Sequence, residues 1–534
     1  MPVLTVVDPP APPARFNFAG DVVYRRARET PNVVATLAVS ADGRVEEWTC
    51  ARIAQASRNL AYAMARAGLA KGDRVLLFME RTAHWQVAMT ACLHLGAVPV
   101  PCVTQVTPVE ISHRLRRSGA RSVICDQPYV GKLEASGESV AVRIARGGAR
   151  EWIDFDAAVC ASDGEVPVAE MKADDPALMY FTSGSSGPPK AVMHAARGIY
   201  VRARQPWRQL GMGPGDVIWT TSDTGWTRAG SCLLFGAWMN GATALLHESP
   251  PEPALRLEVL ERFGVTIFGA VTTELRLIMA AAQRRDLPRL RWTLSAGEAM
   301  TAEMAERWGA FSGRPLLVGY GQSETPTATL TDPSTSAVNG MIGKPMAGND
   351  VRIVDSAGDE CEPLKQGDIA FAAADPGLML GYWQNNAASL ALRAGRWHIT
   401  GDVGYRDAAG ELYFVGRDDD IISSSGYRIG PTEVENALTL HPAVAECAVV
   451  ASPDELRGEV VKAVVVLRSG ERGDDALAAA LQDHVKRQIA PYKYPRKVAF
   501  VAALPRTVSG KISRRLLRDA EFLESATNPV GETR

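Results

Sequence analysis

The feature that most constrains the fold of this chain is an alternation of two hydrophobic patterns between about residues 46 and 270. Residues 51–68 and 83–96 have the spacing and composition of helices. The runs DRVLLFM, ARSVICD, VIWTTSD and ATALLH are apolar, rich in β-branched residues and of strand length. Strands that alternate with helices form parallel sheets covered by helices. We therefore predict an α/β fold built on parallel sheets.

Two changes of pattern divide the rest of the chain. Residues 343–416 hold short strand-like runs separated by Gly and Asp turns, which predicts a small β-rich subdomain. A polar stretch near Arg417–Asp420 follows, and then a fresh α/β pattern begins with PTEVENALTLHP and VVKAVVVL. We predict a large N-terminal domain, residues 1–418, and a small α+β C-terminal domain, residues 419–534.

Composition excludes several classes of function. The apolar and charged fractions, 46% and 22%, are those of an ordinary globular protein. The net charge of -2 gives no reason to expect nucleic acid or an anionic membrane as a partner. The eight cysteines never approach a CxxC spacing, which argues against a zinc site or a disulfide framework. Without a membrane-spanning stretch or a secretory signal at the N-terminus, we expect a cytoplasmic location.

The stretch YFTSGSSGPPK, residues 180–190, is a candidate phosphate-binding loop. A predicted buried strand precedes it and residues 191–207 have helical spacing, so we predict strand, loop, helix. Gly184 and Gly187 let backbone N–H groups turn inward around an anion, and Lys190 adds a mobile charge. Two prolines separate Gly187 from Lys190, so this is not a Walker A loop. Alone, the stretch is equally compatible with a surface turn.

Three further polar clusters help to decide between a phosphate-binding loop and a surface turn. VGYGQSETP carries Ser323 and Glu324, a pair found at helix caps but also suited to a Mg²⁺ ion that bridges phosphates. Asp402 could hold ribose hydroxyls, as acids do in other nucleotide sites, and Arg417 follows fifteen residues later. LPRTVSGKISRR places Lys511 in a polar loop, where a surface lysine would be unremarkable.

Together and in this order, the four segments resemble the adenylate-forming superfamily of acyl-CoA synthetases, adenylation domains and luciferases, over nearly the whole chain. FNFAGDVV, SDTGW, SSSGYRIGPTEVENAL and APYKYPRKV are most similar to the medium-chain acyl-CoA synthetases. The resemblance implies a ligase of fatty acid metabolism that uses ATP, CoA and Mg²⁺. It would join a medium-chain, branched or aromatic acid to AMP, release pyrophosphate, and then transfer the acyl group to CoA.

The resemblance also implies roles for individual residues in adenylation. Lys190 and Arg428 would contact phosphate, and Lys511 would bridge the acyl carboxylate and the α-phosphate; these three are the predicted catalytic residues. Glu324 would bind Mg²⁺. The full set predicted for ATP is Thr182, Ser183, Gly184, Ser185, Ser186, Gly187, Lys190, Gly297, Glu298, Ala299, Tyr320, Gly321, Gln322, Ser323, Asp402, Arg417, Arg428 and Lys511.

Other matched positions concern CoA, the acid and domain movement. Gly321 stands where acetate-specific relatives carry a bulky tryptophan, so it would leave room for a longer acid, with Trp226 and Val271 lining the same pocket. Core packing would explain the last two equally well. Asp419 matches the hinge of a mobile C-terminal domain, with Asp418 and Asp420 as alternatives. The positions matched to CoA are Ser425, Gly426, Tyr427, Arg457, Lys486, Tyr494 and Arg496.

Other functions remain open at this level. The same fold without CoA would be an adenylation enzyme that loads a carrier protein. A catalytically silent nucleotide-binding protein and luciferase-type oxidation are further alternatives. The surroundings of Lys511 resemble sites that protein acetyltransferases modify, and acetylation would remove the charge that adenylation needs. The partners implied are small molecules, and the oligomeric state is left open.

Overall fold

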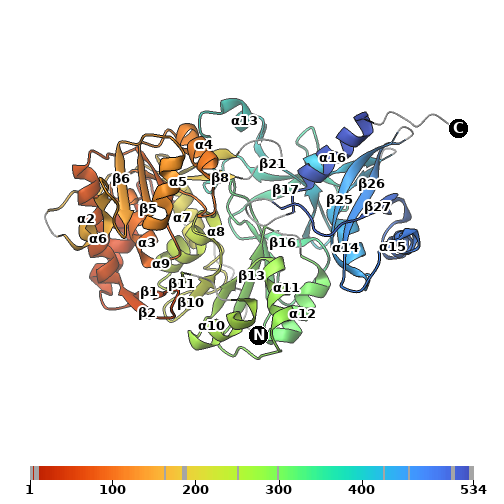
Figure 1. Ribbon diagram of the computed structural model, residues 1–534, viewed down its shortest axis with the longest axis horizontal. Coiled ribbons are helices and arrows are strands. Elements are labelled where there is room, and N and C mark those ends of the chain that lie inside the picture. The colour runs from red at the N-terminus through yellow and green to blue at the C-terminus, as the bar shows by residue number, and fades with distance from the viewer. Residues whose placement is uncertain are drawn as a thin grey trace.

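The computed structural model describes residue 4 and residues 11–161, 164–182, 189–248, 252–297, 300–424, 427–454, 457–506 and 512–527. Figure 1 shows the chain passing from an α/β layer at the left, through a central sheet, to a smaller unit at the right that holds α14–α16. Peripheral and connecting elements are η1 (Ala19–Tyr24), β2 (Val45–Thr49), α4 (Pro108–Ser118), η2 (Gln127–Tyr129), α5 (Val130–Ala135), α6 (Phe155–Cys160), η3 (Gly230–Gly236), α9 (Ala237–Met239), η4 (Pro253–Leu255), α10 (Arg256–Arg262), α12 (Ala302–Ser312), α13 (Asn386–Leu390), β20 (Arg393–Ala394) and η6 (Pro491–Lys493).

A fourteen-stranded sheet forms the centre of the described chain. Its middle strands run parallel, which confirms the predicted fold class. Ile218, Phe268 and Trp292 on these strands are fully buried, because helices cover both faces. In spatial order the parallel strands are β1 (Val34–Val39), β11 (Thr243–His247), β10 (Val217–Thr220), β12 (Ile267–Gly269), β13 (Trp292–Ala296) and β14 (Leu316–Tyr320).

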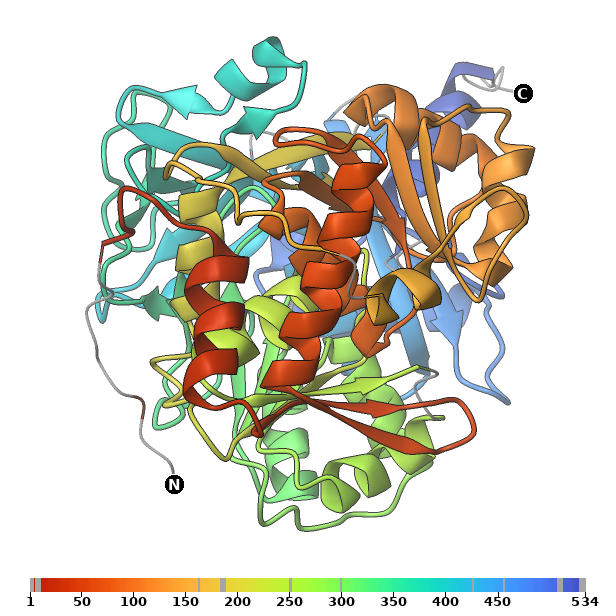
Figure 2. The ribbon, with the colours of Figure 1, turned by 90° about the vertical axis from the view of Figure 1, so that its left-hand side faces the viewer.

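A second, five-stranded parallel sheet builds the other half of the N-terminal layer. Its spatial order is β4 (Val98–Pro101), β3 (Arg74–Phe78), β5 (Ser122–Asp126), β6 (Val142–Arg146) and β7 (Ile153–Asp154). Helix α3 (Ala83–His94) contacts both sheets through β1 and β4 and is buried on every side. Thr49 is the N-cap residue of helix α2 (Cys50–Arg66), and its side chain accepts a hydrogen bond from the N–H of Arg52. Figure 2 shows α1 (Arg25–Glu29) lying beside α2.

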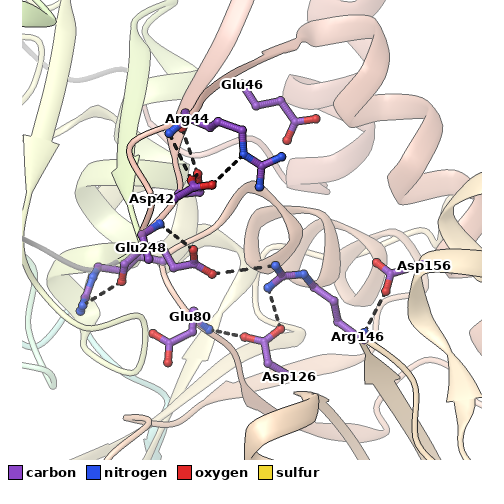
Figure 3. Close-up of polar contacts among 12 residues, drawn as sticks. Asp42, Arg44, Glu46, Glu80, Asp126, Arg146, Asp156 and Glu248 are labelled. Atoms are coloured by element: carbon purple, nitrogen blue, oxygen red, sulfur yellow. Dashed lines mark hydrogen bonds and ion pairs between the residues drawn. The ribbon is translucent and has the colours of Figure 1, made fainter.

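An ion-pair cluster joins the two sheets (Figure 3). Arg146, at the end of β6, donates to Asp126 Oδ1 at 3.0 Å and lies 4.0 Å from Glu248, which follows β11. The carboxylate of Glu248 also accepts the backbone N–H of Ala41 at 3.0 Å. A cavity of about 330 Å³ adjoins this cluster, and none of the residues predicted to bind ATP, CoA or the acid lines it. The cluster therefore connects the two sheets through Arg146, Asp126 and Glu248.

The segment around the candidate phosphate loop differs from its prediction. Strand β8 (Pro176–Thr182) is followed not by a helix but by a second strand, β9 (Lys190–Ala195), and only then by α7 (Ala196–Arg204). Strand β9 lies between two antiparallel neighbours, β8 and β19 (Gly381–Tyr382). Pairing on both sides outweighs the helix-compatible composition of this segment.

The predicted β-rich subdomain is present, but its strands continue the large sheet instead of forming one of their own. They join it through β15 (Thr329–Leu330), which pairs with β14. The antiparallel strands beyond it are β16 (Met341–Pro345), β17 (Val351–Val354), β18 (Gly367–Ala372), β21 (Trp397–Arg406) and β22 (Leu412–Arg417).

Residues from Ile422 onward form an α+β unit with a hydrophobic core of its own, in which Val434, Val449 and Leu481 are fully buried. A single 3₁₀ turn, η5 (Asp418–Asp420), connects it to β22. Its elements are β23 (Ile422–Ser424), β24 (Tyr427–Ile429), α14 (Pro431–Thr439), β25 (Val444–Asp454), β26 (Gly458–Leu467), α15 (Asp475–Gln488), β27 (Lys497–Phe500) and α16 (Arg514–Thr527).

All eight cysteines are free thiols, and every one except the exposed Cys160 is buried. In the part of the chain that the structure describes, no helix combines the length and apolar character needed to cross a membrane.

Candidate active site

Loops that carry predicted site residues follow the carboxyl ends of four neighbouring parallel strands. Trp226 comes after β10, Val271 after β12, Gly297 directly after β13, and Gly321 directly after β14. Trp226 and Val271 are half-buried. Trp226 is the N-cap residue of the short helix α8 (Thr227–Ala229), and Val271 is the N-cap residue of α11 (Thr272–Ala281). Because open parallel sheets bind ligands outside this edge, the topology itself assembles these positions.

The two ends of the candidate phosphate loop face each other. Thr182 ends β8, Lys190 begins β9, and the two residues are directly opposed in the antiparallel ladder. The two strands that flank the loop are therefore held together as a buried antiparallel pair. Ser183, Gly184, Ser185, Ser186 and Gly187 lie outside the described residues.

Lys190 and Glu324 are linked through a residue that the sequence analysis missed. The hydroxyl of Tyr382 donates to Glu324 Oε1 at 2.8 Å, and the ammonium of Lys190 lies 4.9 Å from the centre of the Tyr382 ring. Burial, together with the adjacent Glu324, raises the pKa of Tyr382, so the phenol keeps its proton and donates. No short-range sequence signal could reveal this, because Tyr382 is distant in sequence from both partners.

Asp402 is the centre of a buried polar cluster. Its Oδ2 accepts hydrogen bonds from the hydroxyl of Tyr320 at 2.6 Å and from the side chain of Gln322 at 2.7 Å. Arg417, opposite Asp402 in the ladder of β21 and β22, places Nη1 3.1 Å from Oδ1. Four residues that the sequence predicted for the nucleotide thus lie together, from segments 82 residues apart.

The electrostatics of this cluster favour a charged pair held out of water. Burial raises the pKa of Asp402, and Arg417 opposes that effect. Burial acts to lower the pKa of Arg417, but Asp402 and its neighbours outweigh it, so the guanidinium stays charged. Only 6% of the Asp402 side chain is exposed, and within the described residues Oδ1 receives no hydrogen bond of good geometry. A buried acceptor of this kind fits a ribose hydroxyl, which can donate to it.

The turn that follows β14 is tightly constrained. A Cβ added at Gly321 would lie 2.4 Å from the carbonyl oxygen of Pro326, so only glycine fits without a backbone shift. Within the turn, the N–H of Gln322 donates to Thr325 Oγ1 at 2.9 Å. Close approach of backbone to backbone is thus a second reason for glycine at this position, beside the space for an acid predicted from the sequence.

Arg202 holds the same turn by hydrogen bonds to its backbone, and it was not predicted from the sequence. It is buried on α7, and its Nη2 donates to the carbonyl oxygens of Ser323 at 3.0 Å and Thr325 at 2.8 Å. Burial lowers the pKa of Arg202 to about 10, so it remains a cation at neutral pH. Nothing in the sequence separates Arg202 from the other arginines on this helix.

Of the three residues predicted from Gly297 to Ala299 for ATP, only Gly297 is among the described residues. Gly297 has a φ of +83°, a left-handed conformation that favours glycine. The carbonyl of the preceding residue, Ala296, accepts a hydrogen bond from Arg228. Glu298 and Ala299 lie outside the described residues.

Three of the residues predicted for CoA lie together in the C-terminal unit. The ammonium of Lys486 and the guanidinium of Arg496 lie 4.4 Å and 4.8 Å from the centre of the Tyr494 ring. Arg496 Nη1 also donates to the Tyr494 hydroxyl at 2.7 Å. Arg457 is exposed in the turn between β25 and β26, where its N–H donates to Asp454 Oδ1 at 3.0 Å. Two cations around one ring form a surface suited to phosphates.

Most of the other site residues predicted for this unit lie outside the described residues. Ser425, Gly426 and Lys511 are not among the described residues, and Tyr427 and Arg428 are known only as backbone on β24.

The three acids of the connecting turn differ in their contacts. Asp420 is half-buried between two arginines of α16, with Arg518 Nη1 at 3.4 Å and Arg514 Nη1 at 4.0 Å. Arg518 also donates to the backbone carbonyl of Asp419. Asp418 and Asp419 are exposed. The turn is therefore bound to the last described helix of the chain.

Groups of three or more potential metal ligands do not occur in the described residues. Glu324 alone is consistent with Mg²⁺, which proteins hold through one or two carboxylates together with substrate phosphates. Tyr382 occupies one carboxylate oxygen, Oε1, and this fixes the orientation of the group.

Comparison with known proteins places this geometry in context. Residues 23–383 match the family model described as AMP-binding enzyme, and residues 433–511 match the AMP-binding enzyme C-terminal domain. The human mitochondrial acyl-coenzyme A synthetase ACSM5 is 38% identical over 531 residues, covering 96% of this chain and 91% of that protein. Human mitochondrial ACSM3 is 37% identical, covering 96% of this chain and 90% of that protein.

Solved structures give the same picture. The anthranilate CoA ligase AuaEII in complex with anthranoyl-AMP has a TM-score of 0.86 at 27% identity, with 96% of this chain and 99% of that chain covered. A benzoate CoA ligase from Burkholderia xenovorans LB400 has a TM-score of 0.84 at 29% identity, with 94% and 100% covered.

Proposed function

This chain belongs to the AMP-binding enzymes and, within them, to the AMP-forming acyl-CoA synthetases, and on that premise we propose which acids it activates and which residues do so. The enzyme is a ligase that uses ATP, CoA and Mg²⁺. An acid carboxylate attacks the α-phosphorus of ATP and pyrophosphate leaves; the thiol sulfur of CoA then attacks the acyl carbonyl, the thiol proton is lost, and AMP leaves.

The observation that carries the nucleotide assignment is the buried Oδ1 of Asp402, which pairs with Arg417 but accepts no hydrogen bond of good geometry from the described residues. Asp402 accepts the ribose hydroxyls, and Arg417 keeps its carboxylate ionised. Tyr320 and Gln322 fix that carboxylate through Oδ2 and border the base and the α-phosphate. An acceptor held this way needs no rearrangement when the nucleotide arrives.

Phosphate is held by the loop from Thr182 to Lys190 and by Arg428, and Glu324 would hold Mg²⁺. That ion supplies neutralisation of phosphate charge when bound. A carboxylate that approaches an anionic phosphate needs compensating cations in the transition state, and Lys511 supplies the central one. These assignments rest on the sequence match and on the positions of Thr182, Lys190 and Glu324.

The acid is proposed to be of medium chain length, branched or aromatic. Gly321, Trp226 and Val271 line its pocket at the carboxyl edge of the sheet. One methylene in an apolar pocket changes the transition-state free energy by only about 1–3 kcal/mol, so several acids should react.

The CoA nucleotide lies against Lys486, Tyr494, Arg496 and Arg457, and pantetheine passes Ser425, Gly426 and Tyr427. The C-terminal domain, residues 419–534, rotates about Asp419 between the two half-reactions. A cytoplasmic location and acetylation of Lys511 by a protein acetyltransferase are further proposals; the curated human relatives above are named as mitochondrial.

The test is AMP release from MgATP with acids from acetate to decanoate, isobutyrate and benzoate, each with and without CoA. AMP formation that needs both CoA and a longer or aryl acid supports the proposal. Acid-dependent pyrophosphate exchange without CoA turnover would indicate a carrier-protein loader. Lys511→Ala should abolish exchange yet still convert supplied acyl-AMP to thioester, whereas Lys365→Ala, at an exposed site, should change neither.

A further inference from the structure

Backbone hydrogen bonds from Tyr382 and from the residues before and after it hold Tyr382 in place. It lies on β19, is 8% exposed, and its N–H donates to Ser389 Oγ at 2.8 Å. Around it, Leu380 and Trp383 each donate an N–H to a carbonyl of β9 at 2.8 Å. The strand that begins at Lys190 therefore also holds the segment that carries the Tyr382 ring.

The ring presents two different surfaces to two opposite charges. Its hydroxyl donates to Glu324 Oε1 at 2.8 Å, and its face meets Lys190 Nζ at 4.9 Å from the ring centre. A hydroxyl bond occupies only part of the accepting capacity of a carboxylate. A cation–π contact leaves the N–H donors of an ammonium free for other acceptors.

We infer that Tyr382 is a positioning residue that keeps Lys190 and Glu324 close to one another but available to phosphate and Mg²⁺ instead of to each other. A lysine and a glutamate at one site would otherwise form an ion pair and cancel their charges. The tyrosine gives each an uncharged partner. This inference rests on the proposed function, in which Lys190 contacts phosphate and Glu324 holds the metal.

The decisive variant is Tyr382→Phe, which keeps the ring and removes the hydroxyl. We expect the gain in ATP affinity that Mg²⁺ brings to fall by about fivefold or more, because Glu324 loses its orientation. ATP affinity without metal should stay within about twofold, since the ring still faces Lys190. The readout is isothermal titration of ATP with Mg²⁺ and with EDTA, and thermal melting monitors folding.

Two comparisons sharpen the result. Tyr413→Phe removes another tyrosine–carboxylate bond, to Asp407 Oδ2 at 3.1 Å, and should leave both affinities unchanged. In a Glu324→Gln background, Tyr382→Phe should add no further loss of metal dependence, because the hydroxyl acts through that carboxylate.

The outcomes separate the inference from the function on which it rests. A Tyr382→Phe protein with the wild-type metal effect would overturn the inference, as would an additive loss in the Glu324→Gln background. A wild-type protein whose ATP affinity ignores Mg²⁺ would overturn it as well. If the wild type releases no AMP with any acid but shows the expected metal effects, the proposed reaction fails and the positioning role stands.

Discussion

Asp402 and Arg417 face each other across two antiparallel strands, and their side chains pair at 3.1 Å with the carboxylate almost wholly buried. Two hydrogen bonds from Tyr320 and Gln322 hold the other carboxylate oxygen. Oδ1 of Asp402 accepts no hydrogen bond of good geometry from the described residues, so it can accept one from a nucleotide. This makes the pair the most direct place to test nucleotide binding.

Replacing Asp402 with Asn should raise the KM for ATP by about 10- to 100-fold, because hydrogen bonds to charged groups are worth about 1.5–3 kcal/mol. ATP titration of AMP release measures the effect. Asp350→Asn is the matched control: that acid pairs with Arg352 at 2.7 Å, but both side chains are more than two-fifths exposed. An equal rise in the control would contradict the assignment.

The same carboxylate should make ATP binding sensitive to acid. Burial raises the pKa of Asp402, so its charge is lost at a higher pH than in an ordinary carboxyl group. The KM for ATP should therefore begin to rise at a higher pH than the titration of an ordinary aspartate would give. Initial rates at several pH values, at saturating acid and CoA, measure this. A KM that is flat down to the usual range of an aspartate would count against it.

His398 should contribute a separate pH dependence of stability. Burial lowers the pKa of His398 from 6.5 to about 4, so the folded chain resists the proton that the unfolded chain takes up. Its contribution is complete above the unfolded value and is lost as the pH falls toward 4, by at most about 3 kcal/mol. Urea unfolding across this range should show a shallower loss for His398→Gln than for the wild type.

Arg202→Leu should destabilise the fold by about 2–4 kcal/mol, because two carbonyls of the turn after β14 lose their donor inside the protein. Adenylation should fall in the same variant, since the turn carries Gln322 and Glu324. Arg202→Lys, which keeps a charged donor, should recover part of both. Urea unfolding and pyrophosphate exchange are the measurements, and full activity in the leucine variant would contradict the role.

Arg496→Ala should raise the KM for CoA by about tenfold, since a charge-assisted contact to phosphate is lost. Acid-dependent pyrophosphate exchange, which needs no CoA, should be unchanged. Arg487→Ala provides the control, because Arg487 is exposed on α15 next to Lys486. Loss of exchange in the Arg496 variant would place this cluster in the first half-reaction instead.

Gly321→Ala separates two explanations for a glycine at this position. If the glycine only leaves room for a long acid, alanine should shift preference toward shorter acids and keep the rate. Because the new Cβ would lie 2.4 Å from a backbone oxygen, we expect instead that turnover falls for every acid in the panel.

Local pattern was sufficient for much of this architecture. Periodicity located β3, α2 and α3. The resemblance to the adenylate-forming superfamily brought Tyr320, Asp402 and Arg417 into one prediction. What local pattern could not supply was pairing between distant segments. The spacing of residues 191–207 predicts a helix, yet the first part of this segment is strand β9. One of its two partners, β19, lies far along the chain, and local spacing does not reveal it. The role of Arg202 could not be predicted for the same reason, because the carbonyls to which it donates lie more than a hundred residues away in the sequence.

Arg417 ends β22, and the next residue begins the turn that leads into the C-terminal unit. The guanidinium that pairs with Asp402 therefore belongs to the last strand residue before that turn. Of the four residues of the nucleotide cluster, Arg417 is the one nearest to that turn in the chain. If the C-terminal domain rotates about Asp419 as proposed, the ion pair between Arg417 and Asp402 is the contact of the nucleotide cluster that lies next to the pivot.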